Sequence, residues 1–219
     1  MIEATYIGTY PDQHGSEALV FRNDSTSLTA TIRGVHFSGS DFDLLEPAID
    51  TRAESVGSFT LSSGYLCKCS FTIEIPVPVV LSHSVTTGII TAKLDLGAPS
   101  TNGGVEHEQL MLTLTVWELR IVSSGRSGHF ENELLEIQGE LPEGAYLKAC
   151  INCLYSDYSP YGNGLFGNML CFRNIKDEYL RVTSKEEFWT VHGREDRQVQ
   201  ETYLCEQFML RIPGTGYRG

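Results

Sequence analysis

Four of the six cysteines lie in the last third of the chain, and their spacing suits metal binding. Two of them are separated by only two residues, a spacing that lets both thiolates bind one ion from a single turn. Two more distant cysteines could complete the tetrahedral set of sulfur ligands that zinc prefers in structural sites. The sequence therefore predicts a structural zinc site with four ligands, which are Cys150, Cys153, Cys171 and Cys205.

Two other interpretations of these cysteines stay open. Buried free cysteine is a common core residue, and Cys171 and Cys205 are flanked by Leu, Phe and Tyr. A redox or catalytic thiol is the other possibility, although the Cys-x-x-Cys pair lacks the βαβ context typical of redox proteins. The 17 residues before Cys171 and the 33 before Cys205 also differ from the spacing of a compact zinc ribbon. Cys67 and Cys69 lie two apart in an alternating stretch and are predicted to be core residues.

A stretch rich in tyrosine and glycine follows the Cys-x-x-Cys pair, from residue 155 to residue 168. Tyr and Arg are enriched at the centres of protein interfaces, and aromatic rings offer a large contact area at a low entropy cost. The alternative is that these rings cover the core of a small, metal-bound domain. We predict a contact surface for a protein or peptide partner, made by Tyr155, Asp157, Tyr158, Tyr161, Arg194, Tyr217 and Arg218.

Five short motifs follow one another in the C-terminal part: Cys-x-x-Cys at 150–153, Ser-Asp-Tyr-Ser-Pro-Tyr-Gly at 156–162, Cys-Phe-Arg at 171–173, Tyr-Leu-Cys at 203–205 and Pro-Gly-Thr-Gly-Tyr-Arg-Gly at 213–219. This order of motifs resembles an uncharacterised bacterial protein family, and the similarity covers mainly residues 130–219. That family has no established activity. The resemblance therefore implies no functional residue.

No motif of an enzyme class stands out in the chain. It has no glycine-rich nucleotide loop and no His-Glu-x-x-His zinc motif, and its six histidines are dispersed. Four thiolates on one zinc leave no open position for a substrate, whereas three thiolates and a water would leave one. The predicted function is therefore that of a binding protein. The alternative is a metal- or thiol-dependent hydrolase whose site surrounds the C-terminal cysteines.

Strands must dominate the first part, because apolar and polar residues alternate there in the pattern of half-buried strands. The alternating stretches cover residues 28–33, 69–75 and 90–96. A Gly- and Pro-rich loop at 97–104 leads to a further strand at 108–121, in which a change of parity predicts a bulge near Val116 and a buried Trp117. Residues 1–121 are predicted to form an antiparallel β-sandwich.

A different pattern begins near residue 123, where Ser and Gly predict a linker. Apolar residues at helical spacing then predict an amphipathic helix within residues 122–144, with a pair of strands as the alternative. A capping pattern at Thr183 or Ser184, with Glu186 or Glu187 three residues on, predicts a short second helix that ends at Gly193. Residues 145–219 are predicted to form an α+β module stapled by cysteine, which makes the whole chain mainly β with an α+β C-terminal part.

The charge of the chain is strongly negative, at -12. Residues 1–140 hold 18 acidic against 7 basic residues, a balance of -11, and residues 141–219 hold 10 against 9, a balance of -1. An acidic surface repels phosphate backbones, so nucleic acid is not the expected partner. The N-terminus resembles neither a signal peptide nor a membrane segment, and free thiols fit a reducing compartment. We therefore predict a cytoplasmic protein without membrane binding.

Overall fold

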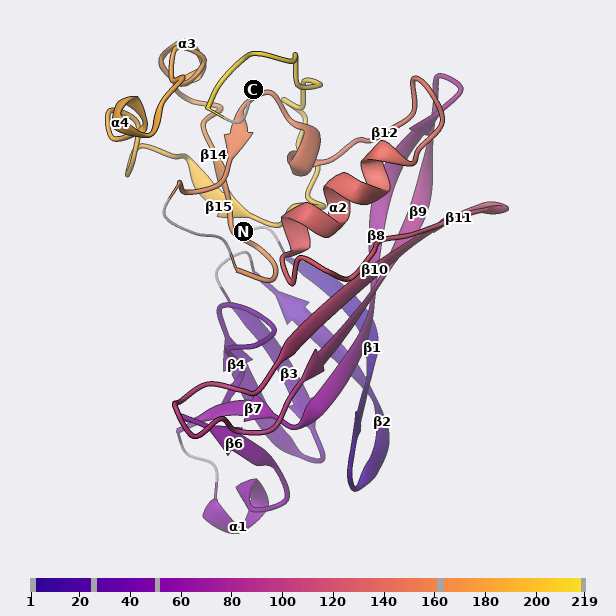
Figure 1. The fold of residues 1–219 in the computed structure, drawn as a ribbon, viewed down its shortest axis with the longest axis vertical. Helices are drawn as coiled ribbons and strands as arrows, with labels where there is room; N and C mark the ends of the chain where they lie inside the picture. The colour runs from indigo at the N-terminus through magenta and orange to yellow at the C-terminus, as the bar shows by residue number, and fades with distance from the viewer. Residues whose placement is uncertain (1–2, 25–26, 50–51, 161–163, 218–219) are drawn as a thin grey trace.

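The computed structural model describes residues 3–24, 27–49, 52–160 and 164–217, and strands dominate it (Figure 1). Within these ranges, no helix is long and apolar enough to cross a membrane. Strands hold 43% of the residues and helices 12%, which confirms that the chain is mainly β.

One antiparallel sheet of ten strands forms most of the structure (Figure 1). Neighbouring strands follow the order β11-β10-β9-β8-β1-β2-β3-β4-β5, and β12 pairs with β8. The longest strands, β8 and β9, pair along their whole length, and β8 also pairs with β12, which leads into the C-terminal part. The strands of this sheet are β1 (Ala4–Asp12), β2 (Gly15–Asn23), β3 (Leu28–Ile32), β4 (Val35–Gly39), β5 (Glu46–Pro47), β8 (Cys69–Leu81), β9 (Ser84–Leu96), β10 (Glu108–Val116), β11 (Leu119–Val122) and β12 (Tyr146–Leu147).

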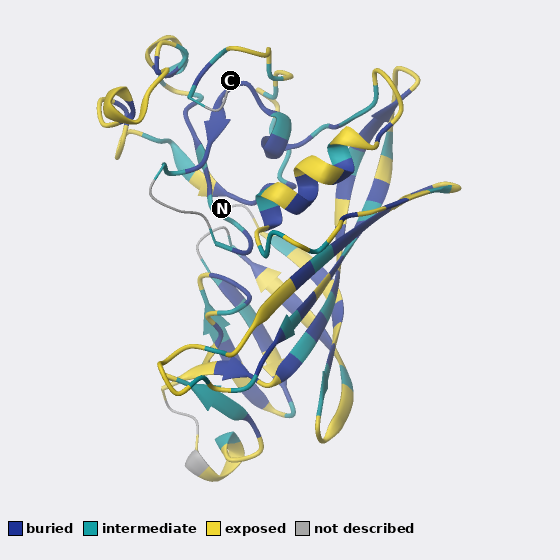
Figure 2. Ribbon diagram, in the orientation of Figure 1, coloured by how far each residue is buried: buried dark blue, intermediate teal, exposed yellow. Residues whose placement is uncertain are grey.

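The sheet has one buried face and one exposed face, as the alternating sequence predicts (Figure 2). In β8, Cys69, Phe71 and Ile73 are buried, and the residues between them are only partly buried. The buried face also contacts the C-terminal part, because the ring of Phe166 lies edge-on to that of buried Tyr6 in β1, with 5.7 Å between centroids. The three alternating stretches are therefore confirmed as strands, and their core continues beyond the first part of the chain.

Two details of this sheet differ from the sequence prediction. Hydrogen bonds join ten strands in one continuous sheet and leave only β6 and β7 as a separate pair among the described residues of this part, so the predicted sandwich is not confirmed. The predicted strand at 108–121 is two strands, β10 and β11, joined by a tight turn at Trp117 and Glu118. This turn, and not a bulge, changes the parity of the apolar residues. Because Trp117 lies in the turn it is 71% exposed, so the prediction of a buried Trp117 is wrong.

Helix α2 (Phe130–Gly139) confirms the helical interpretation and packs its apolar face against β10. The predicted linker before it is held by the helix, because the buried carboxylate of Glu133 accepts hydrogen bonds from the N–H groups of Gly125 and Ser127 at 2.8 and 3.0 Å. Burial raises the pKa of Glu133, but hydrogen bonds from the side chains of Ser123 and Ser127, together with the two N–H groups, outweigh it and leave the pKa below its usual value. The linker and the helix therefore form one ordered unit.

The C-terminal part combines a small sheet with short helices (Figure 1). The side chain of Ser184 accepts a hydrogen bond from the N–H of Glu187, whose carboxylate accepts one from the N–H of Thr183, so the predicted capping pattern is confirmed. The elements are the 3-10 turn η1 (Cys150–Asn152), β13 (Ser156–Asp157), β14 (Met169–Cys171), α3 (Lys176–Tyr179), α4 (Lys185–Phe188) and β15 (Arg197–Val199).

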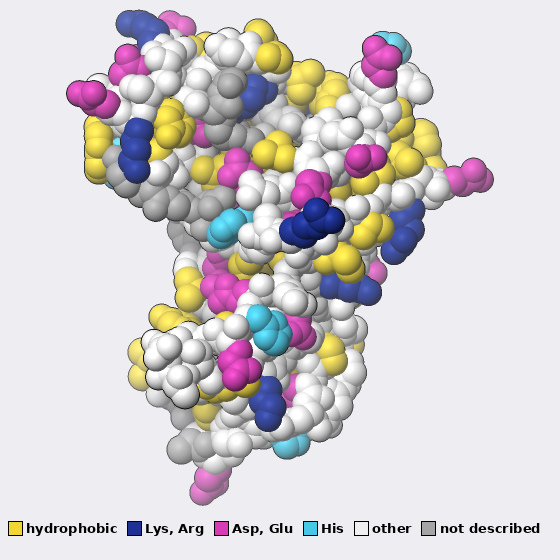
Figure 3. Space-filling model, viewed as in Figure 1, with side chains coloured by type: hydrophobic (Ala, Val, Ile, Leu, Met, Phe, Trp, Pro, Cys, Tyr) yellow, Lys and Arg dark blue, Asp and Glu magenta, His cyan; other side chains and the backbone are white. Residues whose placement is uncertain are grey.

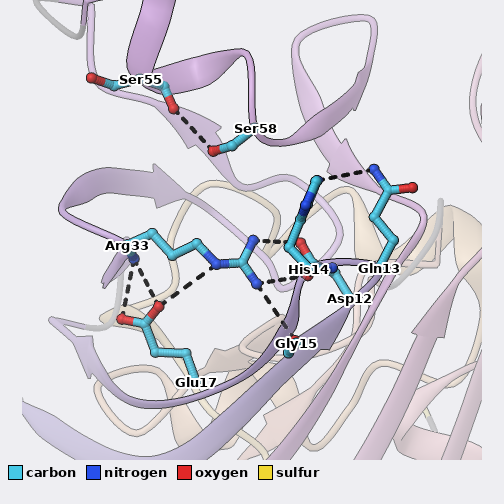
Figure 4. A network of polar contacts seen from close by, with 8 residues as sticks. All are labelled: Asp12, Gln13, His14, Gly15, Glu17, Arg33, Ser55 and Ser58. Carbon is cyan, nitrogen blue, oxygen red and sulfur yellow. Dashed lines mark hydrogen bonds and ion pairs between the residues drawn. The ribbon is translucent and has the colours of Figure 1, made fainter.

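Arg33 joins two hairpin ends at the opposite end of the sheet, near α1 (Ala53–Val56), β6 (Thr60–Ser62) and β7 (Tyr65–Cys67) (Figure 4). Its guanidinium donates to both carboxylate oxygens of Asp12 at 2.6 Å and lies 5.6 Å from the ring centroid of Tyr10. The hydrogen bonds from Arg33 hold the pKa of Asp12 below its usual value. The pair therefore stabilises the folded state as long as Asp12 is ionised.

We expect Arg33→Ala to lower the free energy of unfolding by about 1.5–3 kcal/mol at neutral pH, the range for hydrogen bonds to charged groups. Because the folded pKa of Asp12 is depressed, this contribution is present above the unfolded pKa and is lost as the pH falls through the folded value. Urea unfolding at neutral and acidic pH measures both effects. Arg22→Ala, at an exposed position of β2, is the control and should change stability little. An equal loss for Arg33→Ala at both pH values would argue against the ion pair.

Candidate metal centre and the loop beside it

The four C-terminal cysteines lie on three segments that backbone hydrogen bonds bring together. The η1 turn forms because the N–H of Cys153 donates to the carbonyl of Cys150 at 3.0 Å. Cys171 ends β14 and pairs with Ser156 of β13. Cys205 follows Tyr203, whose carbonyl accepts a hydrogen bond from the N–H of Cys150 at 2.7 Å. Of the four free thiols, three are buried and that of Cys205 is half-buried.

The thiols lie close enough to affect one another's ionisation. Burial raises the pKa of Cys150 well above its usual value, and the negative charges of Cys153, Cys171 and Cys205 raise it further. Burial also raises the pKa of Cys171, and the charges of Cys205 and Cys153 again add to the effect. Removing these protons would require a cation among the sulfurs.

Two arginines supply positive charge next to the thiols. The guanidinium of Arg211 donates to the carbonyl of Cys153 at 3.0 Å and to that of Ser156. The N–H of Arg173 donates to the sulfur of Cys171, and both this bond and the charge of Arg173 lower the pKa of that thiol. Hydrogen bonds and charges of this kind support metal-bound thiolates.

The donor set fits zinc, because four sulfur ligands are typical of structural zinc sites. Within the described ranges, no three His, Cys, Asp or Glu side chains stand in a finished metal-binding arrangement. Binding of an ion would therefore require the thiol groups to move closer to one another. The residues that would hold zinc are those that the sequence singled out.

Two buried carboxyl groups, which the sequence analysis did not single out, hold the segment after the Cys-x-x-Cys pair. Fully buried Glu201 accepts a hydrogen bond from the hydroxyl of Tyr158 at 3.0 Å. Asp41, from the connection between β4 and β5, accepts one from the N–H of Leu165 at 2.6 Å. Asn168 joins the two, because its side-chain amide donates to Asp41 and its N–H donates to Glu201, each at 3.3 Å. The two carboxyl groups are too far apart in sequence for a motif to reveal them.

Both carboxyl groups bind their protons more strongly than usual. Burial raises the pKa of Asp41 to about 7, and the nearby charges of Asp43 and Glu201 contribute to this rise. Burial likewise raises the pKa of Glu201. The contact between the sheet and the C-terminal part is therefore sensitive to pH.

The aromatic residues after the cysteine pair are core residues. The exposed fractions of Tyr155 and Tyr158 are only 8% and 5%, and Asp157 is fully buried. Tyr158 packs in the main core and Tyr155 packs beside Cys153. Asp157 accepts a hydrogen bond from the hydroxyl of Tyr179 at 2.7 Å. The prediction of an exposed contact surface at Tyr155, Asp157 and Tyr158 is wrong, because their polar groups find partners inside the protein: the hydroxyl of Tyr155 donates to the sulfur of Met209 at 3.5 Å, and that of Tyr158 donates to Glu201.

The C-terminal tail also packs against the protein. The ring of Tyr217 lies 5.7 Å from that of Phe188. Gly216 has a φ of +71°, and a Cβ at this position would lie 2.7 Å from the hydroxyl of Tyr179, so only glycine fits there. The half-buried Tyr217 is thus a packing residue, whereas the sequence suggested a residue of a binding surface.

The remaining residues of the predicted contact surface are not brought together. Arg194 is exposed and lies 3.7 Å from the carboxylate of Glu178. Tyr161 and Arg218 lie outside the described residues. The structure therefore does not gather the predicted contact residues, and zinc binding by the four cysteines stays a prediction.

A Ser, an Asp and a His also meet on the sheet, which the sequence analysis missed. Asp95 of β9 accepts a hydrogen bond from the hydroxyl of Ser70 on β8 at 2.7 Å, and its other oxygen lies 2.7 Å from Nε2 of His107. The strand register, which pairs Ser70 with Asp95, could have revealed the first contact. In a nucleophilic triad the imidazole takes the proton of the hydroxyl. Here the hydroxyl contacts the carboxylate, so these residues do not form such a triad.

Comparison with known proteins identifies a family but no activity. A family of unknown function, DUF6304, matches residues 4–156, which include the ten-stranded sheet, α2 and the first two cysteines of the cluster. No curated protein and no solved structure matches the chain. The match confirms an uncharacterised family, but it overlaps the resemblance seen in the sequence only at residues 130–156. Because the match covers more than half of its length, the chain belongs to DUF6304, a family of unknown function.

Proposed function

We propose that this chain is a cytoplasmic binding protein whose C-terminal part is held by one structural zinc ion on Cys150, Cys153, Cys171 and Cys205. The observation that supports the proposal is that backbone hydrogen bonds join the segments that carry the four cysteines, since the N–H of Cys150 donates to the carbonyl of Tyr203 and Cys171 pairs with Ser156. All six cysteines are free thiols, which fits a reducing compartment. Zinc would replace the disulfides that a secreted module of this kind would use.

Binding is favoured over catalysis by the chemistry of the same cysteines. A nucleophilic cysteine needs a lowered pKa, whereas burial raises the pKa of Cys150 and of Cys171. Four thiolates also fill the tetrahedral coordination of zinc and leave no position for substrate. A metal- or thiol-dependent hydrolase, the alternative, would need one of these cysteines to leave the metal.

A protein or peptide is the partner that the charge of the chain favours. The sequence holds 28 acidic against 16 basic residues, and such a surface repels both nucleic acids and anionic membranes. The same charge attracts basic segments of other proteins and increases the rate at which they meet the chain.

Elemental analysis tests the zinc site. Protein purified without chelators should contain about one zinc ion per chain. Cys171→Ser should lose the zinc, whereas Cys67→Ser, which changes a buried thiol on β7 outside the cluster, should retain it. Zinc-free native protein, or full zinc content in Cys171→Ser, would contradict the proposal.

A further inference from the structure

A pocket of about 310 Å³ is lined by residues of three turns at one end of the long strands. The turn between β8 and β9 contributes His83, the turn between β10 and β11 contributes Trp117, and the loop after α2 contributes Glu143. Apolar side chains, including Leu81 and Leu119, line the rest. Figure 3 shows acidic, histidine and hydrophobic side chains together at this end of the molecule. None of the four C-terminal cysteines is among the described residues that line the pocket.

The two strand turns at this pocket adopt left-handed backbone without glycine. Ser82 and His83 have φ angles of 47° and 68°, and Trp117 has a φ angle of 50°. This region is unfavourable for residues that carry a Cβ, and most of all for bulky ones. Two other tight turns of the sheets, Arg33–Gly34 and Ser63–Gly64, place a glycine in the second position. Strain of this kind persists where a side chain serves a function, so His83 and Trp117 mark this pocket as a binding site.

The lining of the pocket favours a cation with an apolar stem. Trp117 is 71% exposed, so its ring is open to a ligand. Glu143 is a carboxylate in the lining, and none of the described lining residues is Lys or Arg. A tryptophan ring beside a carboxylate attracts an ammonium group, and the net charge of -12 increases the attraction. The apolar side chains suit the methylene stem that lysine buries while its charged group stays at the rim.

We propose that this pocket binds a lysine side chain of a protein partner, with the ammonium group between the ring of Trp117 and the carboxylate of Glu143. The inference rests on the proposed binding function and names the chemistry of the partner. It does not depend on zinc, so the two can fail separately. Zinc content should stay at about one ion per chain in every pocket variant.

The test follows Trp117 directly in the full-length Trp189→Phe variant, where it is the only tryptophan. Its indole N–H signal is recorded by NMR while acetyl-Gly-Lys-Gly-amide is added at about pH 8, where imidazoles are neutral. We expect a saturable shift with a dissociation constant of about 1–10 mM, typical of one weak contact. Glu143→Gln should weaken binding about threefold to tenfold.

Three further measurements make the result decisive. The same peptide with norleucine in place of lysine should give no saturable shift, and an equal shift would overturn the proposal in favour of a purely apolar site. Saturation by methyl glucoside but not by the lysine peptide would overturn it in favour of a sugar site. Saturation-transfer NMR, which detects the lysine methylenes when they contact the protein, should give a signal for the parent and none for Trp117→Gly. The variant should nevertheless melt no lower than the parent, because glycine suits the left-handed turn. A lower melting temperature would show that Trp117 is retained for stability.

Discussion

Replacing Cys150 with alanine should remove the bound zinc and release the C-terminal part, while the central strands of the sheet remain folded. In small zinc domains the free energy of metal binding, about 10–16 kcal/mol, is also folding free energy. Cys150 is 3% exposed, and its N–H donates a hydrogen bond to the carbonyl of Tyr203. No neighbouring side chain can therefore move in and take the place of the missing thiol. Hydrogen exchange measures the effect. Amides of residues 150–217 should lose protection, and those of β8 and β9 should keep it.

A chelator distinguishes loss of zinc from loss of packing. Treating the native protein with EDTA should reproduce the exchange pattern of Cys150→Ala, whereas EDTA should have no further effect on the variant. Cys69→Ala, which also removes a buried thiol but lies in β8, is the matched control and should keep its response to EDTA. Equal responses of Cys150→Ala and the native protein to EDTA would show that Cys150 is only a packing residue.

The contact between the sheet and the C-terminal part should weaken as the pH rises toward neutrality. The pKa of Asp41 is about 7 in the folded protein and 3.8 without burial, a difference that corresponds to about 4 kcal/mol. Because the folded pKa is raised, the stabilisation is fully present below the unfolded pKa and is lost as the pH rises through the folded one. The groups that face Asp41 are the acidic Asp43 and Glu201 and the donors Leu165 and Asn168. Ionised Asp41 therefore adds a negative charge next to Asp43 and Glu201, whose negative charges repel it.

Urea unfolding of matched variants between about pH 4 and pH 8 measures this dependence. Asp12 and Asp95, whose pKa values are lowered, change the stability in the opposite direction, so the informative quantity is the difference between variants. Asp41→Asn cannot ionise and should lose the pH-dependent contribution, at a constant cost of about 1–3 kcal/mol for the altered hydrogen bonds. Glu46→Gln, at an exposed position of β5, should behave like the native protein. An unchanged pH dependence in Asp41→Asn would refute the role of Asp41.

The sequence predicted the local elements because their signals are local. Alternation identified the strand with Phe71, helical spacing identified α2, and the capping pattern at Ser184 identified α4. The change in apolar alternation led to the wrong prediction for Trp117, because a two-residue turn and a bulge shift the alternation in the same way. Left-handed backbone at a tryptophan is rare enough that turn rules did not suggest the correct choice.

The candidate sites were predictable only in part, for a related physical reason. Cysteine spacing is a direct chemical signal, and it led to four free thiols of the C-terminal part whose metal binding stays a prediction. The exposure of an aromatic residue depends on partners that are distant in sequence. Tyr158 can be buried because Glu201 accepts a hydrogen bond from its hydroxyl. Glu201 in turn accepts one from the N–H of Asn168. The pocket at Trp117 likewise depends on three turns whose meeting no single stretch of sequence reveals.

X-ray absorption at the zinc edge is the most direct test of the central claim, that four cysteines hold one structural zinc ion. We predict a shell of four sulfur atoms at about 2.3 Å, with no nitrogen or oxygen ligand. Such a shell would leave no position for substrate and would support a binding protein. A shell with three sulfurs and an oxygen at about 2.0–2.2 Å would contradict the account and favour the hydrolase.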